Sequence, residues 1–365
     1  MIKEKNTAVP EERVIGALRS MYAKRGYLPF RMSKFEEYEL YMKNRDFLLG
    51  ENIISFTDTD GALLALKPDV TLSIIKNAKD AAGVKEKVYY NEHVYRTSGS
   101  THKFKEIMQM GLECIGDLDD YDVCEAIELA TESLNEISAD FVLDISHVGF
   151  VSALLDAAGL SEAGRGELIT CISNKNSHET AALLTKYGVS SEEREKILSL
   201  LSVRVPLSLA EKTLAPLAVG ERGRAALSEI SVLAGLLADS PLADKIYFDT
   251  SVMNDMKYYN GIVFRGFVSG VSEGVLSGGR YDALMARMGK DSKALGFAIY
   301  LDLLEGFFEA DDERDVDVLL VYGEKVDTGR VYRRVKELVA DGYSVTAQKA
   351  VPDGLRYGRL ERMEE

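Results

Sequence analysis

The order in which hydrophobic patterns follow one another constrains the fold of this chain more than any other feature of its sequence. An amphipathic helix is predicted at residues 10–25, and residues 52–150 then contain strand-like segments with helices between them, the last of these strands at residues 141–150. Residues 151–243 are rich in Leu, Ala, Glu and Ser and favour several short helices, with no strand of comparable strength. A strand pattern returns at about residue 245. Strands grouped in hairpins indicate an α+β fold rather than an alternating parallel one.

Two hairpins are predicted in the first block. Residues 87–96 and 106–116 are both rich in β-forming residues, and a polar stretch separates them, which predicts a long antiparallel pair. A shorter hairpin is predicted at residues 52–66, because the dipeptide Asp60-Gly61 at its centre is typical of tight turns. Both hairpins place antiparallel strands in the part of the chain that precedes the helical section.

A third unit begins near residue 315. Residues 315–348 predict a strand, a helix and a second strand, and the helix turns four apolar residues inward, namely Val331, Val335, Leu338 and Val339. The tail GLRYGRLERMEE carries three arginines and three glutamates, and we expect it to be solvated and partly frayed. The expected domains are residues 1–150 together with 245–310, residues 151–244, and residues 315–365.

Charge and cysteine content argue against several classes of protein. The chain has 44 Lys and Arg against 59 Asp and Glu, a formal net charge of −15, which disfavours a protein that binds duplex nucleic acid. A local basic patch is not excluded by this sum. The sequence contains only three cysteines. It has neither an apolar segment typical of a signal peptide nor a long apolar run, so we expect a protein of the reducing cytoplasm.

Common catalytic motifs are absent from the sequence. It has no Gly-rich phosphate loop, no dinucleotide-binding fingerprint and no nucleophile elbow. The four histidines are scattered along the chain, so a metal site built on them is not expected.

Polar residues embedded in predicted strands are the best candidates for a binding site. Gln109 and Glu113 are four residues apart on one strand, so both side chains face the same side of the sheet. Burying them is costly unless they are paired or face a ligand. Arg96 ends the neighbouring strand, and Asp69 follows Pro68 where a carboxylate can cap a helix or bind an ammonium group. The cluster could hold the amino and carboxylate groups of an amino acid, although a structural salt-bridge network is the more frequent origin of such a cluster.

Four parts of the sequence resemble the histidyl-tRNA synthetase branch of the class II aminoacyl-tRNA synthetases. VYYNEHVYR with FKEIMQMGLECIG resembles motif 2, and LALKPDVT resembles the segment that places a carboxylate against the substrate amino group. MKYYNGIVF resembles the histidine-recognition segment, and SGGRYDALMARMG with ALGFAIYLDLL resembles the approach to motif 3. The resemblance covers about residues 10–150 and 245–305. It implies a class II synthetase-like antiparallel sheet with flanking helices, an inserted helical module and a short C-terminal α/β unit.

The resemblance is weakest where a synthetase would hold ATP. Thr97-Ser98 follow Arg96, where the family has His-Glu. Leu303 stands where motif 3 ends in an arginine, and Asn254 stands where the histidine-recognition segment opens with one. Adenylation develops charge on the phosphates, which arginines normally stabilise. The resemblance therefore implies a synthetase-like chain that does not activate an amino acid.

The amino-acid end of the site matches the family better. By resemblance, the histidine-binding residues are Asp69, Thr71, Arg96, Gln109, Glu113, Tyr258 and Tyr259. A synthetase relative that keeps a histidine pocket without ATP ligands is similar to the regulatory subunits of ATP phosphoribosyltransferase. That similarity implies a chain with no catalytic residues, no metal and no cofactor of its own.

The similarity to these regulatory subunits also implies partners. The chain would form a homodimer within a hetero-oligomer that contains the short-form catalytic subunit of ATP phosphoribosyltransferase. It would activate that subunit and mediate feedback inhibition by L-histidine in the first step of histidine biosynthesis, with neither a membrane nor tRNA as a partner. Two alternatives stay open, a histidine-sensing synthetase paralogue with another partner and an active histidyl-tRNA synthetase. The helical section would be either a docking surface for the catalytic subunit or a connecting module.

Overall fold

The chain divides into two compact units in the computed structural model, which describes residues 10–48, 53–81, 83–97, 103–253, 258–309 and 314–364. The larger unit is Leu18–Leu303, and the smaller unit combines Met1–Ala17 with Leu304–Glu365. Within the described ranges, no helix is both long enough and apolar enough to span a bilayer.

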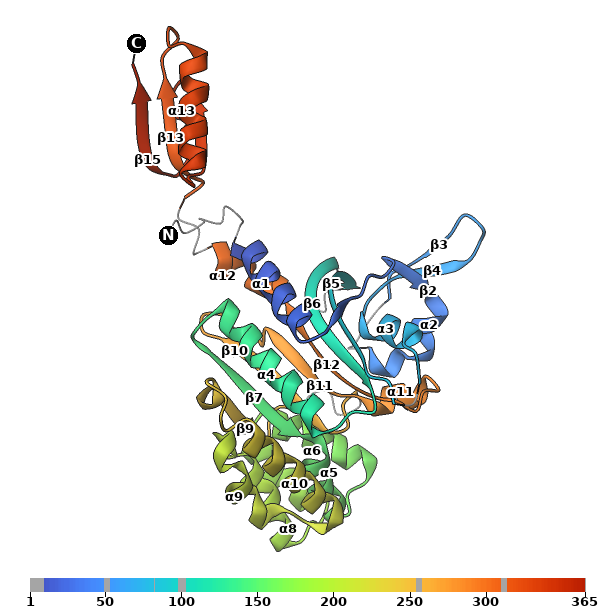
Figure 1. The fold of residues 1–365 in the computed structure, drawn as a ribbon. Coiled ribbons are helices and arrows are strands. Elements are labelled where there is room, and N and C mark those ends of the chain that lie inside the picture. The colour runs from blue at the N-terminus through green and yellow to red at the C-terminus, as the bar shows by residue number, and fades with distance from the viewer. Residues whose placement is uncertain are drawn as a thin grey trace. The chain divides into compact units, whose positions relative to one another are not determined.

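A nine-stranded sheet forms the centre of the larger unit, in the order β1-β5-β6-β12-β11-β10-β7-β9-β8 (Figure 1). Its strands are β1 (Leu28–Pro29), β5 (Glu86–Thr97), β6 (Phe104–Gly116), β12 (Lys293–Tyr300), β11 (Leu276–Arg280), β10 (Ile262–Val268), β7 (Phe141–His147), β9 (Ile246–Asp249) and β8 (Arg204–Pro206). The pairs β1–β5 and β7–β9 are parallel, and the other six are antiparallel. The predicted, mainly antiparallel sheet and the long hairpin of β5 and β6 are confirmed.

Two long helices accompany this sheet. Helix α1 (Pro10–Lys24) confirms the predicted N-terminal helix, and α4 (Asp120–Ile137) packs against β7, β10 and β12. The hydroxyl groups of Tyr22 on α1 and Ser133 on α4 are hydrogen-bonded at 2.8 Å, and both side chains are buried. Because a buried hydroxyl is costly without a partner, this bond favours one alignment of the two helices.

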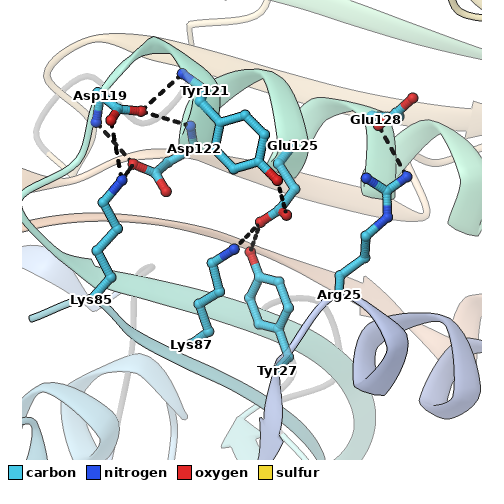
Figure 2. A network of polar contacts seen from close by, with 9 residues as sticks. All are labelled: Arg25, Tyr27, Lys85, Lys87, Asp119, Tyr121, Asp122, Glu125 and Glu128. Atoms are coloured by element: carbon cyan, nitrogen blue, oxygen red, sulfur yellow. Dashed lines mark hydrogen bonds and ion pairs between the residues drawn. The ribbon is translucent and has the colours of Figure 1, made fainter.

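A network of charged and hydroxyl groups ties α4 to β5 and to the chain that follows α1 (Figure 2). The buried carboxylate of Glu125 accepts hydrogen bonds from Lys87 Nζ at 2.5 Å and from the Tyr121 hydroxyl at 2.9 Å. The Tyr27 hydroxyl donates a third bond to the same carboxylate at 3.3 Å. A carboxylate removed from water is tolerated only when such partners compensate for its lost hydration. The network therefore holds α4 against the edge of the sheet next to β1.

A second, three-stranded sheet of the larger unit has the order β2-β4-β3. Its strands are β2 (Phe35–Glu37), β4 (Leu63–Leu66) and β3 (Ser55–Thr57), with the helices α2 (Tyr38–Lys43) and α3 (Thr71–Asn77) nearby in sequence. Strands β3 and β4 pair antiparallel, so the predicted short hairpin is confirmed. Gly61 in its turn has φ +91°, a conformation that glycine adopts without steric cost.

The helical section contains the helices α5 (Val148–Ala157), α6 (Glu162–Ser173), α7 (Ser177–Lys186), α8 (Ser191–Leu200), α9 (Ala210–Leu214) and α10 (Gly220–Leu236). The predicted short helices are confirmed, and one prediction made here is wrong in detail. The strand predicted at residues 141–150 ends at His147, because His147 Nδ1 accepts the backbone N–H of Phe150 at 3.3 Å and caps α5. The section also contains a strand, β8, which pairs antiparallel with β9. Three residues ending in a proline are too few to give a recognisable alternation.

The remaining elements are the short ones of the larger unit and those of the smaller unit. The larger unit also contains α11 (Asp282–Arg287) and 3₁₀ turns at Arg45–Phe47, Leu207–Leu209, Ala215–Leu217, Ala243–Lys245 and Leu301–Leu304, the last of which ends in the smaller unit. The smaller unit contains α12 (Glu305–Glu309), β13 (Val316–Tyr322), α13 (Thr328–Ala340), β14 (Val345–Gln348) and β15 (Tyr357–Met363). Its three strands are parallel, in the order β14-β13-β15.

Two expectations for the smaller unit are wrong. The charged tail is not frayed over residues 357–363, because these residues form β15 and pair with β13. Arg334 Nε on α13 also contacts Glu361 Oε1 on β15 at 2.6 Å, so a charge that looked solvated is paired. Val339 is 56% exposed rather than inward, because its neighbour Leu338 takes the buried position and successive helical residues are turned by about 100°.

Candidate functional site

One pocket on the nine-stranded sheet is lined by all seven residues that the family resemblance assigns to histidine. Strands β6 and β12 contribute to its floor, and the start of α3 and several aromatic residues form its walls. Its empty volume is about 550 Å³ including the open mouth. The other lining residues are Phe47, Val70, Tyr90, Ser277, Tyr281, Gly296, Phe297, Ala298 and Tyr300.

Glu113 lies at the closed end of this pocket. Gln109 and Glu113 are 4% and 2% exposed, and their spacing on β6 places both side chains on the pocket side, as the sequence predicts. The Glu113 carboxylate accepts hydrogen bonds from Thr71 Oγ1 at 2.7 Å and from the Tyr281 hydroxyl at 2.5 Å. Burial raises the pKa of Glu113 to about 8, although these two hydrogen bonds act in the opposite direction.

Glycines on the two central strands make room for these side chains. Gly296 on β12 lies opposite Glu113 on β6, and a Cβ atom there would overlap the Glu113 carboxylate. Gly111, between Gln109 and Glu113, leaves space for Tyr90, whose hydroxyl would lie 2.6 Å from a Cβ atom. Neither glycine can be recognised from the sequence, because only the pairing of the strands brings a large side chain against each position.

Asp69 and Arg96 meet at the start of α3. Asp69 Oδ1 accepts the backbone N–H of Leu72 at 2.8 Å, and Arg96 Nε donates to the Pro68 carbonyl oxygen at 2.8 Å. Burial raises the pKa of Asp69, whereas the backbone hydrogen bonds and the positive charge of Arg96 lower it. Asp69 therefore caps the helix, one of the two roles expected from its position, and it lines the pocket as well.

Aromatic rings form another part of the pocket lining. The ring centroids of Tyr258 and Tyr259 are 4.8 Å apart, and those of Tyr258 and Tyr281 are 5.6 Å apart. Burial raises the pKa of the Tyr258 and Tyr281 hydroxyls well above the usual range, so both stay protonated and can donate hydrogen bonds. Tyr281 belongs to the segment SGGRYDALMARMG, whose resemblance could have identified it as a site residue.

A second cavity adjoins the pocket. It shares Ser277 and Tyr300 with the pocket and has an empty volume of about 1,440 Å³ including its mouth. Its charged lining residues are two cations and three carboxylates, namely Lys105, Arg265, Asp144, Glu273 and Asp302. Lys105 Nζ lies 2.6 Å from Asp302 Oδ2, so one of the two cations is already paired.

Of the three places where ATP ligands would be expected, the structure describes one fully, one in part and one not at all. Leu303 lines the second cavity and offers it an apolar side chain. Asn254 and Ser98 lie outside the described residues, whereas Thr97 is at the end of β5. Among the residues that the structure does describe, no group of three or more His, Cys, Asp or Glu side chains is arranged to bind a metal ion.

The pocket has the chemistry to bind a small zwitterion with an aromatic or heteroaromatic side chain. Carboxylates and one guanidinium group can complement an ammonium and a carboxylate, and tyrosine rings can pack on a flat ring. Glu113 can accept or donate a hydrogen bond, depending on its protonation, at the end where a side chain would lie. The identity of the ligand and the role of each of the seven residues remain predictions.

Comparison with protein families points to one group. The family model described as histidyl-tRNA synthetase matches residues 5–304. The chain is 26% identical over 306 residues to the ATP phosphoribosyltransferase regulatory subunit of Oceanobacillus iheyensis, covering 82% of this chain and 75% of the relative. It is 28% identical over 342 residues to the protein of the same name from Clostridium kluyveri, covering 90% and 87%.

Comparison with solved structures points to the same group of proteins. A crystal structure described as an ATP phosphoribosyltransferase regulatory subunit/histidyl-tRNA synthetase from Bacillus halodurans superposes with a TM-score of 0.76. The two sequences are 25% identical, and the match covers 98% of this chain and 95% of that one. The class II synthetase-like fold expected from the sequence is thereby confirmed.

Proposed function

Because the chain belongs to the histidyl-tRNA synthetase family, we propose that it is a regulatory subunit of ATP phosphoribosyltransferase. It activates a short catalytic subunit and mediates feedback inhibition by histidine in the first step of histidine biosynthesis. The observation that carries this proposal is the contrast between the two adjoining cavities, one equipped for an amino acid and one poorly equipped for ATP. The names of the relatives from Oceanobacillus iheyensis and Clostridium kluyveri support the same function.

In the proposed complex, L-histidine occupies the amino-acid pocket. Its imidazole ring packs among the tyrosines and bonds to Glu113 at the closed end. Its ammonium group lies near Asp69, and its carboxylate lies near Gln109 and Arg96. Each charged group of the ligand then meets a group of opposite charge or a neutral donor, which is what desolvating a zwitterion requires. The burial of Glu113 and the hydroxyl of Thr71 bonded to it support this orientation.

We propose further that the chain has no adenylating activity of its own. The phosphates of ATP carry several negative charges, and they need cations that are free to contact them. The second cavity has one more carboxylate than it has cations, and Lys105 is paired with Asp302. Leu303, in the position where the family has an arginine, supports the same conclusion. A chain that binds histidine without activating it is suited to regulation.

A homodimer is proposed through the smaller sheet of the larger unit. Phe35 on β2 is 47% exposed and Leu63 on β4 is 49% exposed. The rings of Phe35 and Phe56 pack edge to face at 5.7 Å, so the exposed apolar residues lie next to one another. Contiguous exposed apolar surface is typical of protein interfaces. Ser33, where the family has a proline, precedes this surface by two residues.

Feedback inhibition needs only that histidine prefers one arrangement of the complex. A ligand shifts an equilibrium between two states by its difference in affinity for them, and the effect is reciprocal between sites. Binding of the catalytic subunit should therefore change the histidine affinity of this chain by the same factor as histidine changes the affinity of this chain for the catalytic subunit. The helical section, whose role as docking surface or connecting module stays open, is the first place to look for that contact.

The proposal is tested by phosphoribosyl transfer. The short catalytic subunit from the same organism is assayed alone, with this chain, and with this chain plus L-histidine. We expect stimulation by the chain and reversal of that stimulation by histidine. ATP–pyrophosphate exchange that depends on histidine would contradict the proposal and support an active synthetase. Histidine binding without stimulation would also contradict it and support a histidine sensor with another partner.

A further inference from the structure

Tyr300, at the end of β12, lines both cavities. Strand β12 runs beside β6, with Gly296 opposite Glu113 and Tyr300 opposite Gln109. Because Gly296 and Tyr300 are four residues apart on one strand, both lie on the pocket side of the sheet. Ser277 is the other residue that lines both cavities, and its side chain is much smaller than a phenol ring. The boundary between the two cavities therefore consists mainly of Tyr300.

The direction in which a ligand enters follows from the closed end of the pocket. The Glu113 carboxylate is buried, and the hydroxyls of Thr71 and Tyr281 contact it. A ligand that reaches Glu113 with its side chain and places its ammonium group near Asp69 leaves its carboxylate toward Gln109, which lies opposite Tyr300 on the neighbouring strand. Any group attached to that carboxylate would point at the Tyr300 ring and, past it, at the second cavity.

From this arrangement we infer that the Tyr300 ring closes the amino-acid pocket toward the second cavity. It restricts the pocket to free histidine and excludes histidine derivatives that are extended at the carboxylate. The inference rests on the proposed function, because it takes histidine as the ligand of the pocket. It adds that the subunit responds to the free amino acid and not to peptides or esters that carry a histidyl group. The second cavity has the volume to hold such an extension, so its exclusion depends on the ring and not on a lack of space beyond it.

The test uses isothermal titration calorimetry on the full chain. Three ligands are compared, L-histidine, histidyl-glycine, which is extended at the carboxylate, and glycyl-histidine, which is extended at the amino group. The wild type should bind histidine at least about tenfold more tightly than histidyl-glycine. Tyr300→Ala should improve the affinity for histidyl-glycine, relative to that for histidine, about tenfold or more. Glycyl-histidine should bind weakly to both proteins, because its extension points toward Asp69.

A matched variant separates the ring from its hydroxyl. Tyr300→Phe keeps the ring, so it should exclude histidyl-glycine as the wild type does. Tyr300→Ser serves as a second opening variant if Tyr300→Ala fails to fold. The inference is overturned if the wild type binds both ligands equally, if the opening variants gain nothing, or if Tyr300→Phe gains as much as they do. If the wild type does not bind histidine at all, the proposed function is overturned together with this inference. If it binds histidine and only the Tyr300 results fail, the inference alone is overturned.

Discussion

The amino-acid pocket and the second cavity share two lining residues but differ in how their polar groups are used. In the pocket, the carboxylates of Asp69 and Glu113 are held by backbone or hydroxyl groups. In the second cavity, the Lys105 ammonium group forms an ion pair with Asp302. Under the proposed function, the contrast means that one site has lost its ligands for ATP while its neighbour keeps the groups that bind an amino acid. A few side chains decide this, because the strands below them are common to both sites.

The largest expected effect comes from filling the space that Gly296 leaves. A Cβ atom in Gly296→Ala would overlap the Glu113 carboxylate, so either the side chain or β12 must move. We expect a loss of histidine affinity of about 100-fold or more and a decrease in the free energy of unfolding of about 1–3 kcal/mol. Calorimetry and urea unfolding measure the two. Gly166→Ala on α6 is the control, because nothing lies within 4 Å of its added Cβ atom. Unchanged histidine binding by Gly296→Ala would break the assignment of the pocket.

A smaller effect is expected from Glu113→Gln. The substitution keeps the shape of the side chain but prevents it from ionising when a cationic ligand group binds, so the pocket loses one charge-assisted hydrogen bond to the ligand. Histidine binding should weaken by about 1.5–3 kcal/mol, while assembly with the catalytic subunit is unchanged. Calorimetry gives the first quantity and size-exclusion chromatography the second. A histidine response that stays the same would place the effector elsewhere, for example at a subunit interface.

The same residue predicts a pH dependence of stability. The pKa of Glu113 is about 8 in the folded chain, against about 4.3 for an unfolded glutamate. Between these values the folded state holds a proton that the unfolded state has released, so stability is present at low pH and is lost as the pH rises toward 8.

The expected size of this loss is up to about 1.4 kcal/mol per pH unit. Urea unfolding at pH 5.5 and pH 7.5 should therefore show a larger decrease for the wild type than for Glu113→Gln. Asp69, whose pKa is also raised, contributes in the same direction to both proteins and drops out of the comparison. Equal slopes for the two proteins would show that Glu113 is ionised in the folded chain.

The smallest effect is expected in the second cavity. Asp302→Asn removes the partner of Lys105 and leaves that cation able to meet an anion. The side chain of Lys105 is half exposed, so the gain in affinity for pyrophosphate should be only about 0.5–1 kcal/mol, with histidine affinity unchanged. Calorimetry with both ligands checks this. If pyrophosphate affinity instead rises to that expected of an active nucleotide site, Asp302 alone prevents phosphate binding, and the other groups needed for ATP are still in place.

Sequence reasoning reached much of the pocket because the relevant patterns are local. Gln109 and Glu113 face one side of β6, since side chains alternate along a strand, and Asp69 follows a proline at a helix start where a cap is expected. The same reasoning misplaced the start of α5 and did not find β15. Both depend on contacts outside the segment's own pattern, a His147 cap in one case and pairing with β13 along the whole strand in the other.

Local patterns of residues are sufficient to predict the α+β class, the long hairpin of β5 and β6, and the residues that face the pocket from each strand. Packing between distant segments places Gly296 opposite Glu113, brings the Tyr281 hydroxyl to the same carboxylate across 168 residues of sequence, and puts Tyr300 between two cavities. The physical reason is the register between β6 and β12. Alternation along a strand is a local property of the chain, whereas the residue that stands opposite is set by hydrogen bonds to a segment far away in sequence.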